Sequence, residues 1–307
     1  MKKLFSLVIA LFLAIGISGC GGNTGSTAPA DAPTIGFSIS TLSNPFFVSM
    51  RDAAQQKANE LGVNLLVLDA SDQPAQQIND IENLVNQGVK AIVINPTDSD
   101  AVASAVQAAI DAGIPVISVD RSVTGVNVAS HIASDNVAGG RLAGEFIADK
   151  LGGHGNVIEL EGIPGASAAI ERGRGFEEAV AGKLDIIAKQ PANFERAMGL
   201  SVMENLAQAH SGNFQAVFAQ NDEMILGALP ALQNIEGIIT VGFDGGTEAF
   251  EAIRDGRLSA TVAQQPDVMG QLGVENALKL INGESIQASI PAETVLVNAD
   301  NVAQFLD

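Results

Sequence analysis

Short, nearly continuous apolar runs recur along the chain, and many of them are rich in β-branched residues. Most of these runs end in Asp or Asn. Runs of this kind are typical of strands that are buried on both faces of a parallel sheet. We therefore expect strands at residues 34–40, 65–69, 91–95, 115–120, 216–222 and 238–244.

Between these runs, the apolar residues follow the spacing of a helix. Phe47, Met50, Ala54, Ala58 and Leu61 are separated by three or four positions and form one apolar helix face. Alternating strands and helices indicate parallel sheets with helices on both faces. The pattern gives roughly ten strands, which is too many for one small sheet. It therefore predicts an α/β fold with two doubly wound parallel-sheet lobes.

The first residues have the pattern of a secretion signal. Lys2 and Lys3 precede an apolar stretch over residues 4–17, and Cys20 follows a pair of small residues. This short motif resembles the bacterial lipobox, in which the cysteine is lipidated after cleavage; an ordinary secretory signal is the alternative. We expect residues 1–19 to be removed.

The segment that follows has the composition of a flexible tether. Residues 20–33 are dominated by Gly, Ser, Thr, Ala and Pro and show no apolar periodicity. The folded part is thus expected to be extracytoplasmic and anchored to a membrane by lipid. The pattern leaves open whether that place is a periplasm or the outer face of the cell.

Composition excludes several classes of protein. Among 307 residues there are 16 Lys and Arg against 35 Asp and Glu, a formal net charge of −19. Such acidity argues against a nucleic-acid partner, because phosphate backbones attract basic patches. Hydrophobic residues make up 47%, which is far too many for a disordered chain. Cys20 is the only cysteine, so no disulfide within the chain is expected.

Polar side chains that follow the strands are candidates for ligand binding. In doubly wound sheets, ligands bind beyond the carboxyl ends of the strands. Carboxylates, guanidinium groups, amides and flat Phe rings together suit a polyol ring, which needs edge hydrogen bonds and apolar contact on its faces. The candidates are Asn44, Phe46, Phe47, Asp120, Arg121, Arg172, Phe194, Asn221, Asp244 and Gln264.

These residues also have purely structural interpretations. Asp or Asn after a strand is more often a turn former or a helix N-cap than a ligand contact. Phe46 and Phe47, at the start of a helix, would by default be one core residue and one surface residue. From the patterns alone, the chain is an anchored two-lobed α/β protein with a small polar ligand.

Signals of catalysis and of cofactors are weak. The three histidines, His131, His154 and His210, are far apart and lack an obvious serine or cysteine partner. The sequence contains no Gly-x-Gly-x-x-Gly fingerprint and no cluster with metal-ligand spacing. We therefore expect no catalytic residues, no metal and no cofactor.

Several sequence blocks together resemble the substrate-binding proteins of bacterial ABC sugar transporters, which have the periplasmic-binding-protein type I fold. The similarity spans nearly all of residues 34–307. The blocks are residues 40–49, 94–102, 117–121, 133–136, 171–173, 219–224 and 242–245.

The resemblance implies D-ribose as the ligand and assigns roles to the candidate residues. Hydrogen bonds would come from one lobe through Asn44, Asp120 and Arg121, with Ser40 close by. Phe46 and Phe47 would cover the sugar on that side, and Phe194 would stack on it from the other side. The second lobe and the hinge would contribute Arg172, Asn221, Asp244 and Gln264.

The resemblance also implies a division of the chain and a set of partners. One lobe would hold residues 34–134 and 265–293, and the other residues 135–264 and 294–307, joined by a three-segment hinge. Closure on the sugar would prepare the protein, as a monomer, to dock on ABC permease subunits. A chemoreceptor is a further partner that the resemblance leaves open.

Three alternatives remain beside this interpretation. The same fold could serve another pentose, a hexose or a furanose-like signal. A sugar-responsive transcription regulator would need a basic N-terminal DNA-binding segment, where this chain has the lipobox. An extracytoplasmic sugar-processing enzyme would need paired carboxylates, and Asp120 with Asp244 is the one pair to consider.

Overall fold

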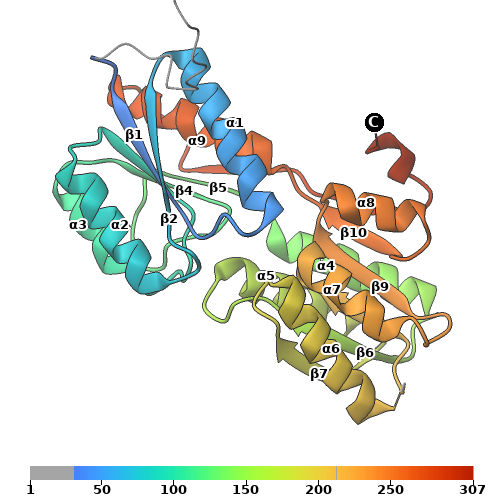
Figure 1. The fold of residues 1–307 in the computed structure, drawn as a ribbon. Coiled ribbons are helices and arrows are strands. Elements are labelled where there is room, and N and C mark those ends of the chain that lie inside the picture. Colours follow the sequence, from blue (N-terminus) through green and yellow to red (C-terminus); the bar gives the residue numbers. More distant parts are fainter. Residues whose placement is uncertain (1–30, 212, 307) are drawn as a thin grey trace, which may run out of the picture.

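Two α/β lobes, each built on a six-stranded sheet, make up the protein in the computed structural model (Figure 1), which describes residues 31–211 and 213–306. The expected removal of residues 1–19, the lipidation of Cys20 and most of the tether lie outside the described residues. Within the described ranges, no helix is both long and apolar enough to cross a membrane.

The first sheet has the strand order β11-β5-β4-β3-β1-β2, and all its pairs are parallel. Helices α1 and α9 cover one face, and α2 and α3 cover the other (Figure 1). Its strands are β1 (Thr34–Ile39), β2 (Asn64–Asp69), β3 (Ala91–Ile94), β4 (Val116–Val119), β5 (Ser130–Ser134) and β11 (Ser289–Ala292). Its helices are α1 (Pro45–Leu61), α2 (Pro74–Asn86), α3 (Ala103–Asp111) and α9 (Pro266–Ile281).

The second sheet has the order β12-β10-β9-β8-β6-β7. Its strands are β6 (Asn156–Glu161), β7 (Asp185–Pro191), β8 (Ala216–Ala219), β9 (Ile239–Asp244), β10 (Ala260–Ala263) and β12 (Val295–Asn298). The helices are α4 (Asn136–Lys150), α5 (Ser167–Val180), α6 (Arg196–His210), α7 (Asp222–Leu232) and α8 (Thr247–Arg254), and a short 3-10 turn, η1 (Val302–Gln304), follows β12.

The two sheets depart from the expected pattern at their edges. The described residues form twelve strands rather than roughly ten. The six expected runs correspond to β1, β2, β3, β4, β8 and β9. Of the others, β11 and β12 are short and partly exposed; the apolar run in β12, Val295 to Val297, is only three residues long. In addition, β12 pairs with β10 in the antiparallel sense, so the second sheet is mixed rather than wholly parallel.

The chain passes between the two sheets three times. It leaves the first sheet after β5, returns after β10 through α9, which packs on α1, and crosses again between β11 and β12. Each lobe is therefore assembled from segments that are distant in the sequence.

Apolar cores fill both faces of each sheet. Phe37 and Met50 lie in the core beneath α1 and α9, and Leu84 and Ile92 lie in the core beneath α2 and α3; all four are fully buried. The runs predicted as strands are buried because helices cover them on both sides, as expected for a doubly wound fold.

Close contact between α4 and α5 fixes the position of one candidate residue. A Cβ on Gly140 would lie 2.1 Å from the carbonyl oxygen of Arg172, and a Cβ on Gly175 would lie 2.0 Å from the carbonyl oxygen of Val137. Only glycine allows the two helices to approach this closely. The close packing of α5 on α4 therefore fixes the position of the Arg172 backbone relative to α4.

Candidate functional site

A narrow space lies between the lobes, beyond the carboxyl ends of the strands in both sheets. Nine of the eleven candidate residues line it, together with Ala168, which the sequence patterns did not single out. The lining residues are Asn44, Phe46, Phe47, Asp120, Arg121, Ala168, Arg172, Phe194, Asn221 and Asp244.

Asp120 and Arg121 follow β4 and form the charged part of the first lobe's side. Asp120 Oδ2 accepts a hydrogen bond from Asn95 Nδ2 at 3.1 Å and lies 3.6 Å from Arg121 Nε. Asp120 Oδ1 is buried and has no partner. The backbone φ of Asp120 is +62°, a left-handed conformation that is costly for a residue other than glycine.

Arg121 is buried between two aromatic rings from different lobes. Its guanidinium carbon lies 5.1 Å from the ring centre of Phe47 and 5.2 Å from that of Phe194. Its Nη1 donates to the carbonyl of Pro96 at 3.0 Å, whereas its buried Nε has no hydrogen-bond partner. Burial lowers the pKa of Arg121, and the negative charges of Asp120 and Asp72 oppose this shift.

Arg172 is the charged centre of the second lobe's side. Its Nε donates to Asn136 Oδ1 at 2.9 Å, and its Nη1 donates to the carbonyl of Gln220 at 2.7 Å. Nη1 also lies 3.4 Å from Asp244 Oδ1, and the guanidinium packs 3.9 Å from the ring centre of Phe243. These contacts restrict the orientation of the Arg172 side chain.

Asp244 ends β9 and is held in place from two directions. Its Oδ1 accepts a hydrogen bond from Gln264 Nε2 at 2.8 Å. The turn after it is held by Asp222 Oδ2, which accepts from the backbone N–H groups of Gly245 and Gly246, each at 2.8 Å. Burial raises the pKa of Asp244 well above its usual value; Arg172 opposes the shift, and the nearby Asp222 and Asp120 add to it.

Phe194 reaches the space through a strained turn. The φ angles of Asn193 and Phe194 are +55° and +63°, which is unusual for a bulky aromatic residue. A Cβ on Gly162 would lie 2.0 Å from the edge of the Phe194 ring, so glycine at this position makes room for the ring.

Phe46 and Phe47 are both buried, and their ring centres are 5.2 Å apart in an edge-to-face arrangement. The default interpretation, one core residue and one surface residue, is wrong. The second lobe covers the start of α1, so a position that would be exposed on an isolated lobe is enclosed here.

Asn44 and Asn221 combine two roles. Asn44 Oδ1 accepts from Phe46 N and caps α1, while Asn221 Oδ1 accepts from Met224 N and caps α7. The structural interpretation of these residues as N-caps is therefore correct, although both also line the space. Asn221 Nδ2 donates to the carbonyl of Phe194 and so supports its strained turn.

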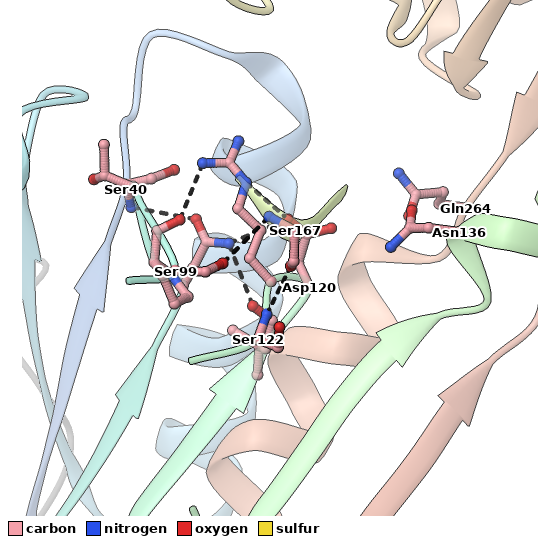
Figure 2. Close-up of polar contacts among 12 residues, drawn as sticks. Ser40, Ser99, Asp120, Ser122, Asn136, Ser167 and Gln264 are labelled. Carbon is pink, nitrogen blue, oxygen red and sulfur yellow. Dashed lines mark hydrogen bonds and ion pairs between the residues drawn. The ribbon is translucent and has the colours of Figure 1, made fainter. Parts of the chain in front are cut away.

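Ser40 and Gln264 adjoin the space but do not line it. The backbone N–H of Ser40 donates to Asn95 Oδ1, which connects it to Asp120. Gln264 lies beyond β10 and Asn136 beyond β5, where the chain crosses between lobes (Figure 2). Ser40 Oγ and Gln264 Oε1 are both buried without a hydrogen-bond partner.

Supporting residues form a layer that the patterns did not assign to the site. Asn95 and Asn136 orient Asp120 and Arg172, and Gln220 orients Arg172 through its carbonyl oxygen. Asn95 ends a predicted strand, so its position in the sequence could have marked it as a site residue. Nothing local in the sequence connects Asn136 with Arg172, which lies 36 residues away.

The arrangement suits a neutral ligand with many hydroxyl groups. Charged donors and acceptors surround the space on its edges, and Phe rings form apolar walls. Within residues 31–211 and 213–306, no group of three or more His, Cys, Asp or Glu side chains is placed to hold a metal ion.

Comparison with known protein families is consistent with this geometry. The model of the periplasmic binding protein domain matches residues 35–285. The chain belongs to the periplasmic binding protein family. Proteins of this family are extracytoplasmic, and the family and its relatives are solute-binding transport proteins.

Three relatives cover almost the whole chain. The ribose import binding protein RbsB of Escherichia coli (strain K12) is 51% identical over 300 residues, 97% of this chain and 98% of that protein. RbsB of Bacillus subtilis (strain 168) is 45% identical over 302 residues, 95% of this chain and 97% of that protein. A solute-binding protein of Actinobacillus succinogenes 130z, solved with bound D-allose, has a TM-score of 0.82 and 33% identity, covering 89% of this chain and 99% of that one.

A fully buried carboxylate lies behind the site of this periplasmic binding protein. Glu159 Oε1 accepts from Gln220 Nε2 at 2.8 Å, and Gln220 Oε1 accepts from the backbone N–H of Gly162. Lys189 Nζ lies 3.8 Å from Glu159 Oε2, too far for a hydrogen bond. Burial raises the pKa of Glu159 to about 7, although Gln220 and Lys189 partly oppose the shift.

We predict that Glu159→Gln reduces the dependence of stability on pH. The folded protein holds the Glu159 proton more tightly than the unfolded chain does, so the protonated side chain contributes to folding stability. This contribution is complete below pH 4.5 and is lost as the pH rises through about 7. The substitution should remove a loss of about 3 kcal/mol between pH 4.5 and pH 8. Urea unfolding at several pH values measures the difference.

Glu161→Gln is the control for loss of a carboxylate beside Lys189, since Glu161 is half-buried and lies 3.2 Å from the same ammonium group. Parallel stability curves for the wild type and Glu159→Gln would show that Glu159 does not titrate differently on folding.

Proposed function

We propose that this protein captures D-ribose outside the cytoplasm by closing its two lobes on the sugar and delivers it to an ABC importer. The observation that carries the proposal is a pair of buried polar atoms without partners on residues that line the space, Asp120 Oδ1 and Arg121 Nε, with the unpartnered Gln264 Oε1 beside it. A buried polar atom without a partner is costly, and sugar hydroxyls can both donate and accept hydrogen bonds. The relatives named for ribose import support this choice of sugar.

The proposed contacts follow the geometry of the space. Asp120 Oδ1 accepts from a hydroxyl, and Arg121 and Asn44 donate to the sugar from the first lobe. Phe46 and Phe47 cover one face of the sugar, and Phe194 stacks on the other. Arg172, Asn221, Asp244 and Gln264 act from the second lobe and its crossing segment, and Ser40 acts behind Asp120 through Asn95.

Closure depends on the division of the chain into two moving bodies. In this proposal, residues 34–134 and 265–293 move against residues 135–264 and 294–307, with the hinge at 134–135, 264–265 and 293–294. A ligand shifts the equilibrium only through contacts that the open form lacks. D-ribose reaches both lobes, so its binding favours closure, and the closed monomer then docks on the permease.

The magnitude of the binding energy is consistent with a small ligand. Micromolar binding corresponds to about −8 kcal/mol. Spread over about ten heavy atoms, this is roughly −0.8 kcal/mol per atom, within the limit for small ligands.

Another sugar is the second candidate. A protein that is 33% identical to this chain was solved with bound D-allose, so the same fold can also hold a hexose. The relatives named for ribose import, which are 45–51% identical, favour the pentose.

The first test is calorimetric titration of the purified protein with D-ribose, D-allose, D-xylose, L-arabinose and D-glucose. We expect one site with micromolar or tighter affinity for D-ribose and much weaker binding of the other sugars. Calorimetry is preferable because the chain lacks Trp and Tyr. Preference for another sugar would keep the transport role and change the ligand, whereas a folded, sugar-free sample that binds none of them would overturn the proposal.

Two variants test the assignment of the site. Asp120→Ala and Asp244→Ala should each weaken D-ribose binding at least tenfold, because each removes an acceptor and leaves a buried guanidinium without its carboxylate. Asp100→Ala is the matched control, since this exposed carboxylate lies in the same lobe as Asp120 and away from the space. Wild-type affinity in both site variants would remove these residues from the site.

Membrane anchoring is a separate part of the proposal and rests on Cys20. We expect Cys20→Ala to move the protein from the membrane fraction to the soluble extracytoplasmic fraction and to abolish incorporation of a labelled fatty acid. A variant that stays in the membrane fraction would show that the protein is retained by other means.

A further inference from the structure

Three serines connect the two lobes outside the proposed sugar site. We call Ser99, Ser122 and Ser167 the cross-lobe serine cluster. Ser99 and Ser122 lie in the segments that follow β3 and β4, and Ser167 is the first residue of α5. Figure 2 shows the three side by side, and the hydrogen bonds between them join the two lobes.

The cluster forms three hydrogen bonds between the lobes. Ser99 N donates to the carbonyl of Gly165 at 3.1 Å. Ser167 N donates to Ser99 Oγ at 3.2 Å, and Ser122 N donates to Ser167 Oγ at 2.9 Å. Ser99 and Ser167 are both buried. These bonds exist only while the lobes are in contact.

The other lobe supplies a missing cap to α5. The N-cap position of α5 is Ala166, whose side chain cannot accept a hydrogen bond, and no side chain of its own lobe caps the helix. Ser99 Oγ takes this role from across the cleft, because it accepts the N–H of the first helical residue. Helix α5 also carries Arg172, so the cap supports a site residue.

The segment that presents Ser99 is ordered before the lobes meet. Asp98 Oδ1 accepts from the backbone N–H groups of Asp100 and Ala101, and Thr124 N donates to the carbonyl of Ser99. These bonds all lie within the first lobe. The backbone at Ser99 is therefore held in position by the first lobe alone.

The cluster does not touch the enclosed space. None of its three serines lines the space between the lobes, although Ala168, the neighbour of Ser167, does. Contacts that are present in the closed form and independent of the ligand add the same free energy to the binding of every ligand that closes the protein. Side chains that touch the sugar act differently, because their effect depends on which hydroxyl they meet.

We propose that the cross-lobe serine cluster sets the population of the closed form and thereby raises the affinity for all sugars by one common factor without affecting selectivity. This inference rests on the proposed sugar-binding function with lobe closure. Residues that do not contact the sugar would then help to determine how tightly the sugar binds.

The test compares Ser99→Ala, Ser167→Ala and the double variant with the wild type, by titration with D-ribose and with the next tightest sugar of the panel. The double variant removes two of the three cross-lobe acceptors and should weaken both sugars about tenfold. The ratio of the two affinities should stay within twofold of the wild type. Asp120→Ala, in contrast, should change that ratio.

Two further measurements make the outcome decisive. Ser201→Ala, an exposed serine that bonds only within α6, is the control for loss of a hydroxyl. Small-angle scattering of the ligand-free protein should show a larger radius of gyration for the double variant, and thermal unfolding checks that it remains folded.

Unchanged affinities and an unchanged radius of gyration in the folded double variant would overturn the inference, as would a loss confined to one sugar. If the wild type binds no sugar, the proposed function fails; the scattering comparison still decides whether the serines hold the lobes together.

Discussion

The site depends on the burial of opposite charges where two sheets meet. Arg121 and Arg172 come from different lobes, and each is buried beside a carboxylate, Asp120 and Asp244 respectively. A buried ion without a counter-ion costs several kcal/mol, so each pair must stay together and be held by further hydrogen bonds. This requirement accounts for the surrounding amides, Asn95 and Asn136 among them, which fix one member of each pair.

Backbone strain follows from the same arrangement. Asp120, Phe194 and Asp244 all have positive φ angles, and each lies just beyond or at the end of a strand and lines the enclosed space. Such angles are costly for residues other than glycine, and Asn221, Asp222 and Gly162 stabilise these turns through hydrogen bonds or by leaving room.

The sequence predicts what local physics determines and misses what only the tertiary fold brings together. The α/β fold and the strand that precedes Asp120 were predictable, because a short, continuous β-branched run fits few structures besides a strand buried on both faces. Strand β12 and its antiparallel pairing were not, since its apolar run is only three residues long and nothing local specifies its partner β10. Asn136 was missed because its partner Arg172 is distant in the chain, and burial of both Phe46 and Phe47 requires the second lobe.

Affinity and selectivity have separate physical origins in this molecule. In the proposed function, the charged groups and rings around the space distinguish one arrangement of hydroxyls from another, because a wrong epimer leaves a buried group unpaired. Ser167 at the start of α5 meets Ser99 and Ser122 of the other lobe, and none of the three lines that space, so these contacts respond to closure itself. Substitutions at Ser99 and Ser167, whose hydroxyl oxygens accept the cross-lobe hydrogen bonds, are therefore expected to change affinity while the proposed sugar contacts stay the same.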